Sequence, residues 1–220
     1  PISPLIICLT SYLIITFFNF LFTELERSKV RTAFSQYLAP EMVSRLAESS
    51  ESLKLGGEKK NMTFLFSDIR GFTAISESYK SNPEELTELI NNLLTVLSNE
   101  ILDNAGTIDK YMGDCIMAFW NAPTDQDNHT DLALKASFDM EKALKEFNIE
   151  FEKQKGMELK IGIGINTGEC IVGNMGSEKR FDYTVLGDPV NLASRLEGQS
   201  GTYGFQRILG QETVNGLKSN

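Results

Sequence analysis

The chain has 220 residues, a length that suits one domain of ordinary size with short appendages. It carries 21 Lys and Arg against 30 Asp and Glu, and this acidic balance argues against a nucleic-acid partner, which would require a basic surface. Hydrophobic residues make up 41% of the chain, so it is not disordered, and its three widely spaced cysteines cannot build a disulfide framework or a zinc knuckle. Because the chain begins with Pro1 and not with Met, we expect it to be a piece of a longer protein.

Residues 1–23 contain no charged side chain and are almost wholly apolar. As a helix rising ~1.5 Å per residue, this stretch would cover roughly the ~30 Å of a bilayer core. A signal-peptide core would need a basic segment before it and a cleavage site after it, and a helix buried in a water-soluble protein is rarely apolar on all sides. Arg27, Lys29 and Arg31 follow directly, and the positive-inside rule then places the rest of the chain in the cytoplasm. We therefore predict a transmembrane helix at 1–23 and a location at the cell membrane, with a cytoplasmic domain after it.

Residues 24–59 are predicted to form a cytoplasmic helical connector. Apolar residues at helical spacing continue to Pro40, which interrupts the helix, and a second short helix follows it. Polar, turn-rich stretches at 48–52 and 56–60 then indicate a domain boundary. Two hypotheses remain open for this segment: a plain spacer, or a paired helix that passes a membrane signal to the next domain.

From about residue 60 the chain alternates apolar runs typical of strands with amphipathic helices. A continuous apolar run predicts a buried strand at 62–67, and Asn82 followed by Pro83 predicts a helix start. The further predicted elements are strands at 107–112 and 115–120 joined by Gly113 and Asp114, a helix at 132–151, strands at 160–165 and 170–172, and a helix that begins at Asp188. This order predicts an α+β fold with an antiparallel-rich sheet and helices on one face.

Two aspartates fall where predicted strands end, Asp68 after the first strand and Asp114 at the hairpin tip. A carboxylate that closes an apolar strand is unfavourable unless it is solvated or paired. If both meet at one sheet edge, they could hold divalent cations of the kind used in magnesium-dependent phosphoryl chemistry. From their spacing alone, two ordinary turn aspartates remain the simpler interpretation.

Three motifs make the sequence resemble the class III nucleotidyl cyclases. They are FSDIRGFT at 66–73, KYMGD at 110–114 and GDPVNLASRL at 187–196, in the order and approximate spacing of that family. The resemblance covers residues 60–220 and implies the ferredoxin-like cyclase catalytic domain. An apolar helix followed by RTAFSQYLAPE at 31–41 is similar to bacterial cyclases that carry an extracytoplasmic CHASE-type sensor upstream. Because the family domain normally continues past a helix near Gln211, we expect this domain to be incomplete at its C-terminal end.

The resemblance implies an adenylate cyclase, in which the ribose 3′-oxygen of ATP attacks the α-phosphate to give 3′,5′-cyclic AMP and pyrophosphate. Asp68 and Asp114 match the two metal-binding aspartates, with the backbone carbonyl of Ile69 as a further ligand for two Mg²⁺ or Mn²⁺ ions per site. Asn191 and Arg195 match the pair that orients the ribose and stabilises the transition state. The family's sites combine residues of two chains, so the presence of every class of site residue here implies a homodimer with shared sites.

Lys110 and Thr184 match the pair that selects the base. A Lys ammonium only donates, which suits adenine N1, and a Thr hydroxyl can accept from the adenine N6 amine. Guanylate-forming members usually carry an acid at the position of Lys110, so ATP is the expected substrate. The alternatives are a guanylate cyclase and a catalytically inactive cyclase-like domain that only binds a nucleotide or relays a signal. Thr in place of Asp at position 184 resembles the subgroup that responds to bicarbonate.

Two basic residues are candidates for binding the substrate phosphates. Arg70 lies within the first motif, and Lys179 lies near where the family places a basic phosphate contact. For both, solvated surface charge is an equally good interpretation.

Overall fold

The computed structural model describes residues 12–22 and 55–218, which belong to two units, Pro1–Ser52 and Leu53–Asn220. In the first unit, residues 12–22 form a helix whose apolar side chains are exposed. At ~1.5 Å per residue this helix is about 16 Å long, roughly half of a bilayer core. Across the described parts of the chain, no helix has the length and apolar character needed to cross a membrane.

That finding corrects two predictions, the transmembrane helix at 1–23 and the location at the cell membrane. The apolar run is real, but its described helical part is too short to span a bilayer. Residues 1–11 and 23 of the predicted span lie outside the described residues, as do residues 24–54 of the predicted connector.

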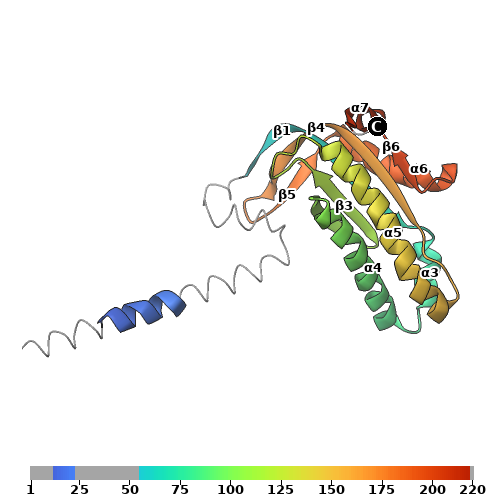
Figure 1. Cartoon of the computed structure of the whole chain (residues 1–220), viewed down its shortest axis with the longest axis horizontal. Coiled ribbons are helices and arrows are strands. Elements are labelled where there is room, and N and C mark those ends of the chain that lie inside the picture. Colours follow the sequence, from blue (N-terminus) through green and yellow to red (C-terminus); the bar gives the residue numbers. More distant parts are fainter. Residues whose placement is uncertain (1–11, 23–54, 219–220) are drawn as a thin grey trace, which may run out of the picture. The chain divides into compact units, whose positions relative to one another are not determined.

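The second unit holds all three motifs (Figure 1). Its elements, in chain order, are β1 (Gly56–Ile69), α3 (Phe72–Ser78), α4 (Pro83–Asp103), β2 (Thr107–Met112), β3 (Cys115–Trp120), α5 (His129–Lys155), β4 (Ile161–Ser177), β5 (Arg180–Leu186), α6 (Asp188–Tyr203), β6 (Arg207–Leu209) and α7 (Gln211–Gly216). The predicted hairpin is confirmed with the same bounds in β2 and β3. β1 begins before the boundary expected near residue 60, β4 is one strand where two were predicted, and β5 was not predicted.

Local chemistry explains the turns around the first motif. Gly71 takes up a left-handed conformation with φ of 69°, which lets the chain turn sharply from β1 into α3. The helix start predicted at Asn82 is confirmed in α4: the Asn82 side chain accepts a hydrogen bond from the backbone N–H of Glu85 at 3.4 Å. Pro83 then sits in the first turn, where its missing N–H is not needed.

The strands follow the order β2-β3-β1-β4-β5, and neighbours in this order run antiparallel. β4 pairs with β1 from Ile161, opposite Ile69, to Asn174, opposite Gly56. The other edge of β4 is shared, because residues 163–165 pair in parallel with β6 while residues 171–177 pair with β5. The α+β fold with an antiparallel-rich sheet is thus confirmed.

Both faces of the sheet are covered, so β1 is buried on both sides. On one face, Leu65 of β1 belongs to a core that includes residues of α4 and α5, the two helices that lie along the sheet in Figure 1. On the other face, Phe64 and Phe66 pack with Val190 and Ala193 of α6. Helices were predicted on one face only, which holds for α4 and α5 and is wrong for α6. The physical reason is that successive residues of β1, which point to opposite faces, are apolar on both.

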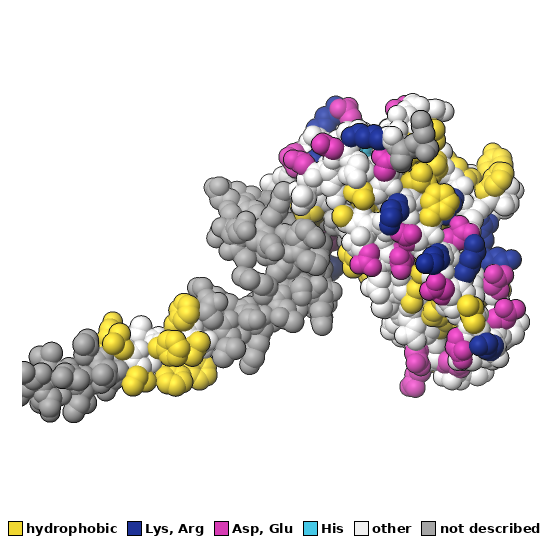
Figure 2. Space-filling view, viewed as in Figure 1, with side chains coloured by type: hydrophobic (Ala, Val, Ile, Leu, Met, Phe, Trp, Pro, Cys, Tyr) yellow, Lys and Arg dark blue, Asp and Glu magenta, His cyan; other side chains and the backbone are white. Residues whose placement is uncertain are grey.

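The surface over α4 and α5 mixes acidic and basic side chains (Figure 2). Along α5, Lys135 and Asp139 form an ion pair at 2.7 Å, and Lys145 and Glu141 form another at 2.8 Å. Both pairs are one helical turn apart, the spacing at which charged side chains on a helix meet.

β5 folds back over the sheet face that carries Phe64 and Phe66, and it reaches β3 and β2 at the other end of the strand order. The ring of Tyr183 in β5 lies 6.4 Å from the ring of Phe119 in β3, and Thr184 of β5 donates a hydrogen bond to Asp109 of β2 at 3.0 Å. β5 therefore brings residues of β2 and of the chain's C-terminal half together.

Candidate active site

The structure brings the two predicted metal-binding aspartates together. Asp68 is near the end of β1, and Asp114 follows β2 at the hairpin tip; the pairing of Ser67 with Ile116 sets these two points side by side. The backbone N–H of Ile69 donates to Asp68 Oδ1 at 3.0 Å and to Asp114 Oδ2 at 3.3 Å. One backbone group thus binds both carboxylates.

The electrostatics of this pair favour a cation. Partial burial, and then the neighbouring carboxylate of Asp68, raise the pKa of Asp114 to about 7. Glu197 of α6 adds a third acid, because its pKa is raised by burial and then by the charge of Asp68, while Arg70 opposes the shift. Carboxylates crowded in this way resist ionisation unless positive charge joins them, so the donor set fits a divalent cation.

Within the described residues, no group of three or more His, Cys, Asp or Glu side chains has the arrangement of a complete metal site. A cation here would rest on Asp68 and Asp114, with its remaining ligands from the backbone, water or substrate phosphates, as hard cations in phosphoryl-transfer sites often do. Cys115 is close by, but burial and the charges of Asp68 and Glu197 raise the pKa of its thiol to about 12, so it stays protonated and is a poor ligand.

The predicted base-selecting residues also meet, and they meet at a residue that sequence reasoning missed. Thr184 Oγ1 donates to Asp109 Oδ2 at 3.0 Å, and Lys110 Nζ lies 3.5 Å from the same oxygen. The side chain of Asp109 is 1% exposed, whereas that of Lys110 is 42% exposed. Lys110 is therefore partly exposed, and its ammonium lies beside the same buried carboxylate of Asp109 that Thr184 binds.

Asn191 and Arg195 lie one turn apart on α6, and both are exposed. The helix follows Gly187 and has Pro189 in its first turn, which fixes where these residues fall. Arg195 Nε donates to the backbone carbonyl of Asn191 at 3.3 Å. Among the residues that the structure describes, neither side chain is joined by a hydrogen bond or ion pair to Asp68 or Asp114, so the chain does not unite the two pairs by itself.

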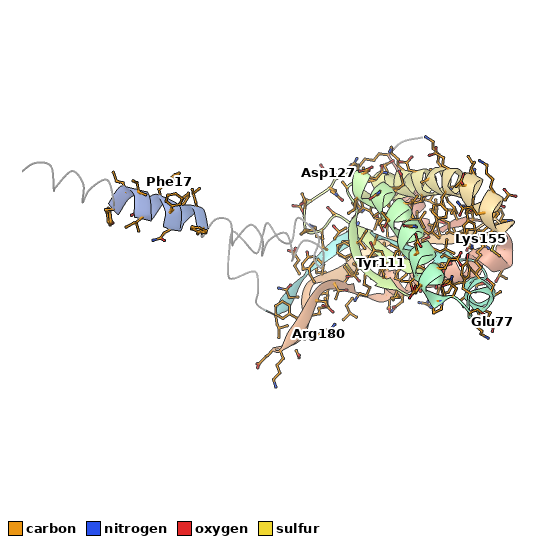
Figure 3. All side chains as sticks on the ribbon, turned by 90° about the horizontal axis from the view of Figure 1, so that it is seen from below. Phe17, Glu77, Tyr111, Asp127, Lys155 and Arg180 are labelled. Carbon is orange, nitrogen blue, oxygen red and sulfur yellow. The ribbon has the colours of Figure 1, made fainter. Side chains whose placement is uncertain are left out.

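The two predicted phosphate-binding residues have different surroundings. The Arg70 guanidinium donates to the carbonyl of Ile161 at 3.3 Å, to the hydroxyl of Ser200 at 3.1 Å and to the carbonyl of Phe205. These bonds tie the end of β1 to β4 and to the end of α6. Lys179 lies in the exposed turn between β4 and β5, next to Arg180, which projects from the tip of that hairpin in Figure 3. A phosphate contact of either residue stays a prediction.

Comparisons with known proteins agree with this geometry. Residues 56–218 match the sequence model of the adenylate and guanylate cyclase catalytic domain. The chain is 36% identical to an adenylate cyclase of Anabaena cylindrica over 195 residues, which is 86% of this chain and 38% of that protein. It is 34% identical to adenylate cyclase 1 of Rhizobium meliloti over 172 residues, 78% of this chain and 25% of that protein. The chain thus spans well under half the length of these relatives.

Two solved structures are similar in fold and sequence. The adenylyl cyclase CyaB from P. aeruginosa has a TM-score of 0.67 and 39% identity, covering 74% of this chain and 83% of that one. The guanylyl cyclase Cya2 has the same TM-score and identity, covering 75% and 82%. With the matched region extending over every element from β1 to α7, the chain belongs to the family of adenylate and guanylate cyclase catalytic domains, the class III nucleotidyl cyclases.

Proposed function

We propose that this domain converts ATP to 3′,5′-cyclic AMP and pyrophosphate. The observation that carries the proposal is the meeting of Asp68 and Asp114 on one backbone N–H, at the end of the central strand β1 and beside the β2–β3 turn of the cyclase fold. Members of the family generally use divalent metal ions and work as dimers. The reaction joins the ribose 3′-oxygen to the α-phosphorus and breaks the bond from that phosphorus to the oxygen of the β-phosphate.

Asp68 and Asp114, with the carbonyl of Ile69, would hold two Mg²⁺ or Mn²⁺ ions. Cations bound there would lower the pKa of the 3′-hydroxyl and neutralise the triphosphate. Asn191 would orient the ribose, and Arg195 would set a permanent forked positive charge beside the charge that develops on the phosphate. Arg70, next to the carboxylates, and Lys179, in the turn between β4 and β5, are the candidates for binding the substrate phosphates.

We propose a homodimer with two shared sites. Its support is the separation described above: the carboxylates lie at the end of β1, while Asn191 and Arg195 are exposed on α6. A two-fold dimer can set α6 of one protomer against the carboxylates of its partner, and symmetry then makes a second equivalent site.

The choice of ATP over GTP rests on Lys110 and Thr184. Lys110 offers only donors, which suits adenine N1 and not the N1–H of guanine. The likeness to the guanylyl cyclase Cya2, equal in identity to that of CyaB, keeps a guanylate cyclase as the second candidate. Thr at position 184 further supports a response to bicarbonate.

The deciding experiment incubates the chain with ATP or GTP and with Mg²⁺ or Mn²⁺, and identifies the cyclic product by mass spectrometry. We expect cyclic AMP from ATP and much less cyclic GMP from GTP. Any effect of added sodium bicarbonate is judged against the same concentration of sodium chloride. Formation of cyclic GMP from GTP at a rate equal to or greater than that of cyclic AMP from ATP would favour the guanylate cyclase. Absence of any cyclic product from folded dimers would favour the inactive domain.

A further inference from the structure

Asp109 is a buried carboxylate that the mechanism above does not use. Its side chain is 1% exposed, and its Oδ1 has no hydrogen-bond partner among the described residues. A buried carboxylate with one oxygen unpaired is unfavourable for folding, so its presence calls for an explanation. Its other oxygen, Oδ2, faces both Thr184 and Lys110, the two residues expected to meet the base.

A bulge in β2 makes this arrangement available. The register of β2 against β3 shifts between Ile108 and Lys110, which pair with the adjacent residues Ala118 and Met117. Asp109 is therefore the extra residue of a β-bulge. In a regular strand neighbouring side chains point to opposite faces, and a bulge re-aims them. Here it lets Asp109 and Lys110 approach each other at 3.5 Å and lets Asp109 reach β5.

The hydrogen bond to Asp109 decides what Thr184 can offer a base. A Thr hydroxyl has one proton and can either donate or accept, so on its own it suits the 6-amino group of adenine and the 6-oxygen of guanine equally. An ionised carboxylate only accepts, so Thr184 must use its proton on Asp109. The Thr184 oxygen is then left as an acceptor, which matches the amino group of adenine and opposes the oxygen of guanine.

The pKa of Asp109 is raised, mainly by burial, and its two neighbours work against that rise. Burial raises its pKa, whereas the charge of Lys110 and the hydrogen bond from Thr184 lower it. The three residues thus support one another: Lys110 and Thr184 favour the charged form of Asp109, and the charged form fixes their hydrogen-bonding pattern.

We propose that Asp109 is a positioning residue for base selection, which commits the Thr184 hydroxyl to act as an acceptor and holds Lys110 beside it as the donor. This inference rests on the proposed function, since it concerns the same nucleotide site. It assigns the preference for a 6-amino purine nucleotide to three residues, of which Asp109 does not touch the base.

The test measures binding of 3′-deoxy-ATP and 3′-deoxy-GTP by calorimetry, because nucleotides without a 3′-hydroxyl cannot be cyclised and the readout is independent of turnover. Asp109→Ala should reduce the preference for the adenine nucleotide by about three- to tenfold, the usual effect of one hydrogen bond. Asp109→Asn has the same shape and serves if the alanine variant does not fold; it should also reduce the preference, because an amide can donate to Thr184 as well as accept.

Two further variants separate this role from a general effect. Asp182 is an exposed carboxylate of β5 that acts on Asp109 only through its charge, so Asp182→Asn should leave the ratio of affinities unchanged. In a chain that already carries Thr184→Val, Asp109→Ala should change the ratio of adenine to guanine nucleotide affinity by a smaller factor than it does in the unaltered chain. The reason is that part of the effect of Asp109 depends on the Thr184 hydroxyl.

An unchanged ratio in folded Asp109 variants, or an equal factor with and without the Thr184 hydroxyl, would overturn the proposal. Failure of the proposed function would look different. It would appear as no cyclic AMP from the unaltered chain, whatever the ratio of binding affinities in the variants.

Discussion

Replacing Gly164 by Ala should damage the site, although Gly164 is not one of the residues assigned to it. Gly164 lies in the middle of the sheet, opposite Phe66 of β1 and Ile208 of β6, and α6 passes directly over it. A Cβ built at this position would lie 2.2 Å from the backbone nitrogen of Glu197 and 2.3 Å from the backbone oxygen of Ala193. Both are backbone atoms of α6, so no side-chain rotation relieves the overlap and the helix itself has to move.

The size of the effect follows from these distances. Ordinary contacts of a Cβ begin at about 3.4 Å, so α6 must shift by roughly 1 Å. Overpacking of this kind typically costs ~1–3 kcal/mol in the free energy of unfolding. The same shift would displace Asn191 and Arg195, and a misplacement of about 1 Å in a catalytic group can lower turnover roughly a hundredfold. We therefore expect a folded but weakly active chain.

The assay combines urea unfolding with the rate of cyclic nucleotide formation, and Gly198→Ala is the matched control. Gly198 also belongs to α6, but a Cβ there meets no atom within 4 Å. Alanine is better than glycine inside a helix by roughly 0.5–1 kcal/mol, so this variant should be slightly more stable than the unaltered chain. If Gly164→Ala proves as stable and as active as Gly198→Ala, the close packing of α6 on β4 does not position the site.

Four other outcomes test the site. Asp68→Ala or Asp114→Ala should abolish cyclisation and leave the fold intact, because each carboxylate serves the cation; near-normal turnover in either variant would show that the two-metal assignment is wrong. An inactive Asp68→Ala chain mixed with an inactive Arg195→Ala chain should regain activity, since a heterodimer contains one complete site. Heterodimers that are detected by mass spectrometry but have no activity would refute shared sites. Lys110→Glu with Thr184→Ser should move the ratio of kcat/KM for ATP and GTP toward GTP by roughly ten- to hundredfold, because guanine N1–H needs an acceptor; an unchanged ratio would mean that Lys110 does not meet the base. Without divalent cations, the melting temperature should fall as pH rises from about 4 to about 7. The pKa of Asp114 is raised to about 7 in the folded chain, which therefore binds this proton more tightly than the unfolded chain does and loses the resulting stability over this window. Asp114→Asn should flatten the plot of melting temperature against pH, measured by calorimetry, and an equally steep plot would contradict the assignment.

Local chemistry made several elements predictable from the sequence. The β2–β3 hairpin and the start of α4 depend on a two-residue turn with Gly113 and on the Asn82 cap, and both signals act over a few residues. The break predicted between the strands at 160–165 and 170–172, where Thr167 and Gly168 favour a turn, was wrong. Both residues pair with β1, at Thr63 and Met62, so long-range pairing overrides the local preference for a turn.

The face that α6 covers was harder to predict, because it depends on glycines whose role is visible only in three dimensions. In Lys160–Ile165 the isoleucines alternate with Gly162 and Gly164, which the sequence presents as a strand with one apolar face. In the structure the glycine face is where α6 packs, with the Glu197 side chain close to Gly162 and the backbone of α6 close to Gly164. Glycines on this face of β4 leave room for the backbone of a helix to pack closely against the strand. A face exposed to solvent would have carried polar side chains instead.

The proposed base-selecting site shows the same limit for chemistry. Lys110 and Thr184 were assigned from the resemblance to the cyclase family, and each expected role followed from its own donors and acceptors. Asp109 could not, since alternation in a regular strand would point it away from Lys110, and its hydrogen-bond partner lies 75 residues further along the chain. Only the bulge in β2 and the return of β5 across the sheet bring the three together. If the proposed role of Asp109 is right, a Lys and Thr pair at these positions is insufficient to specify adenine. Without an acceptor behind it, the Thr hydroxyl would be free to donate to guanine, and the same two residues would discriminate less between the two bases.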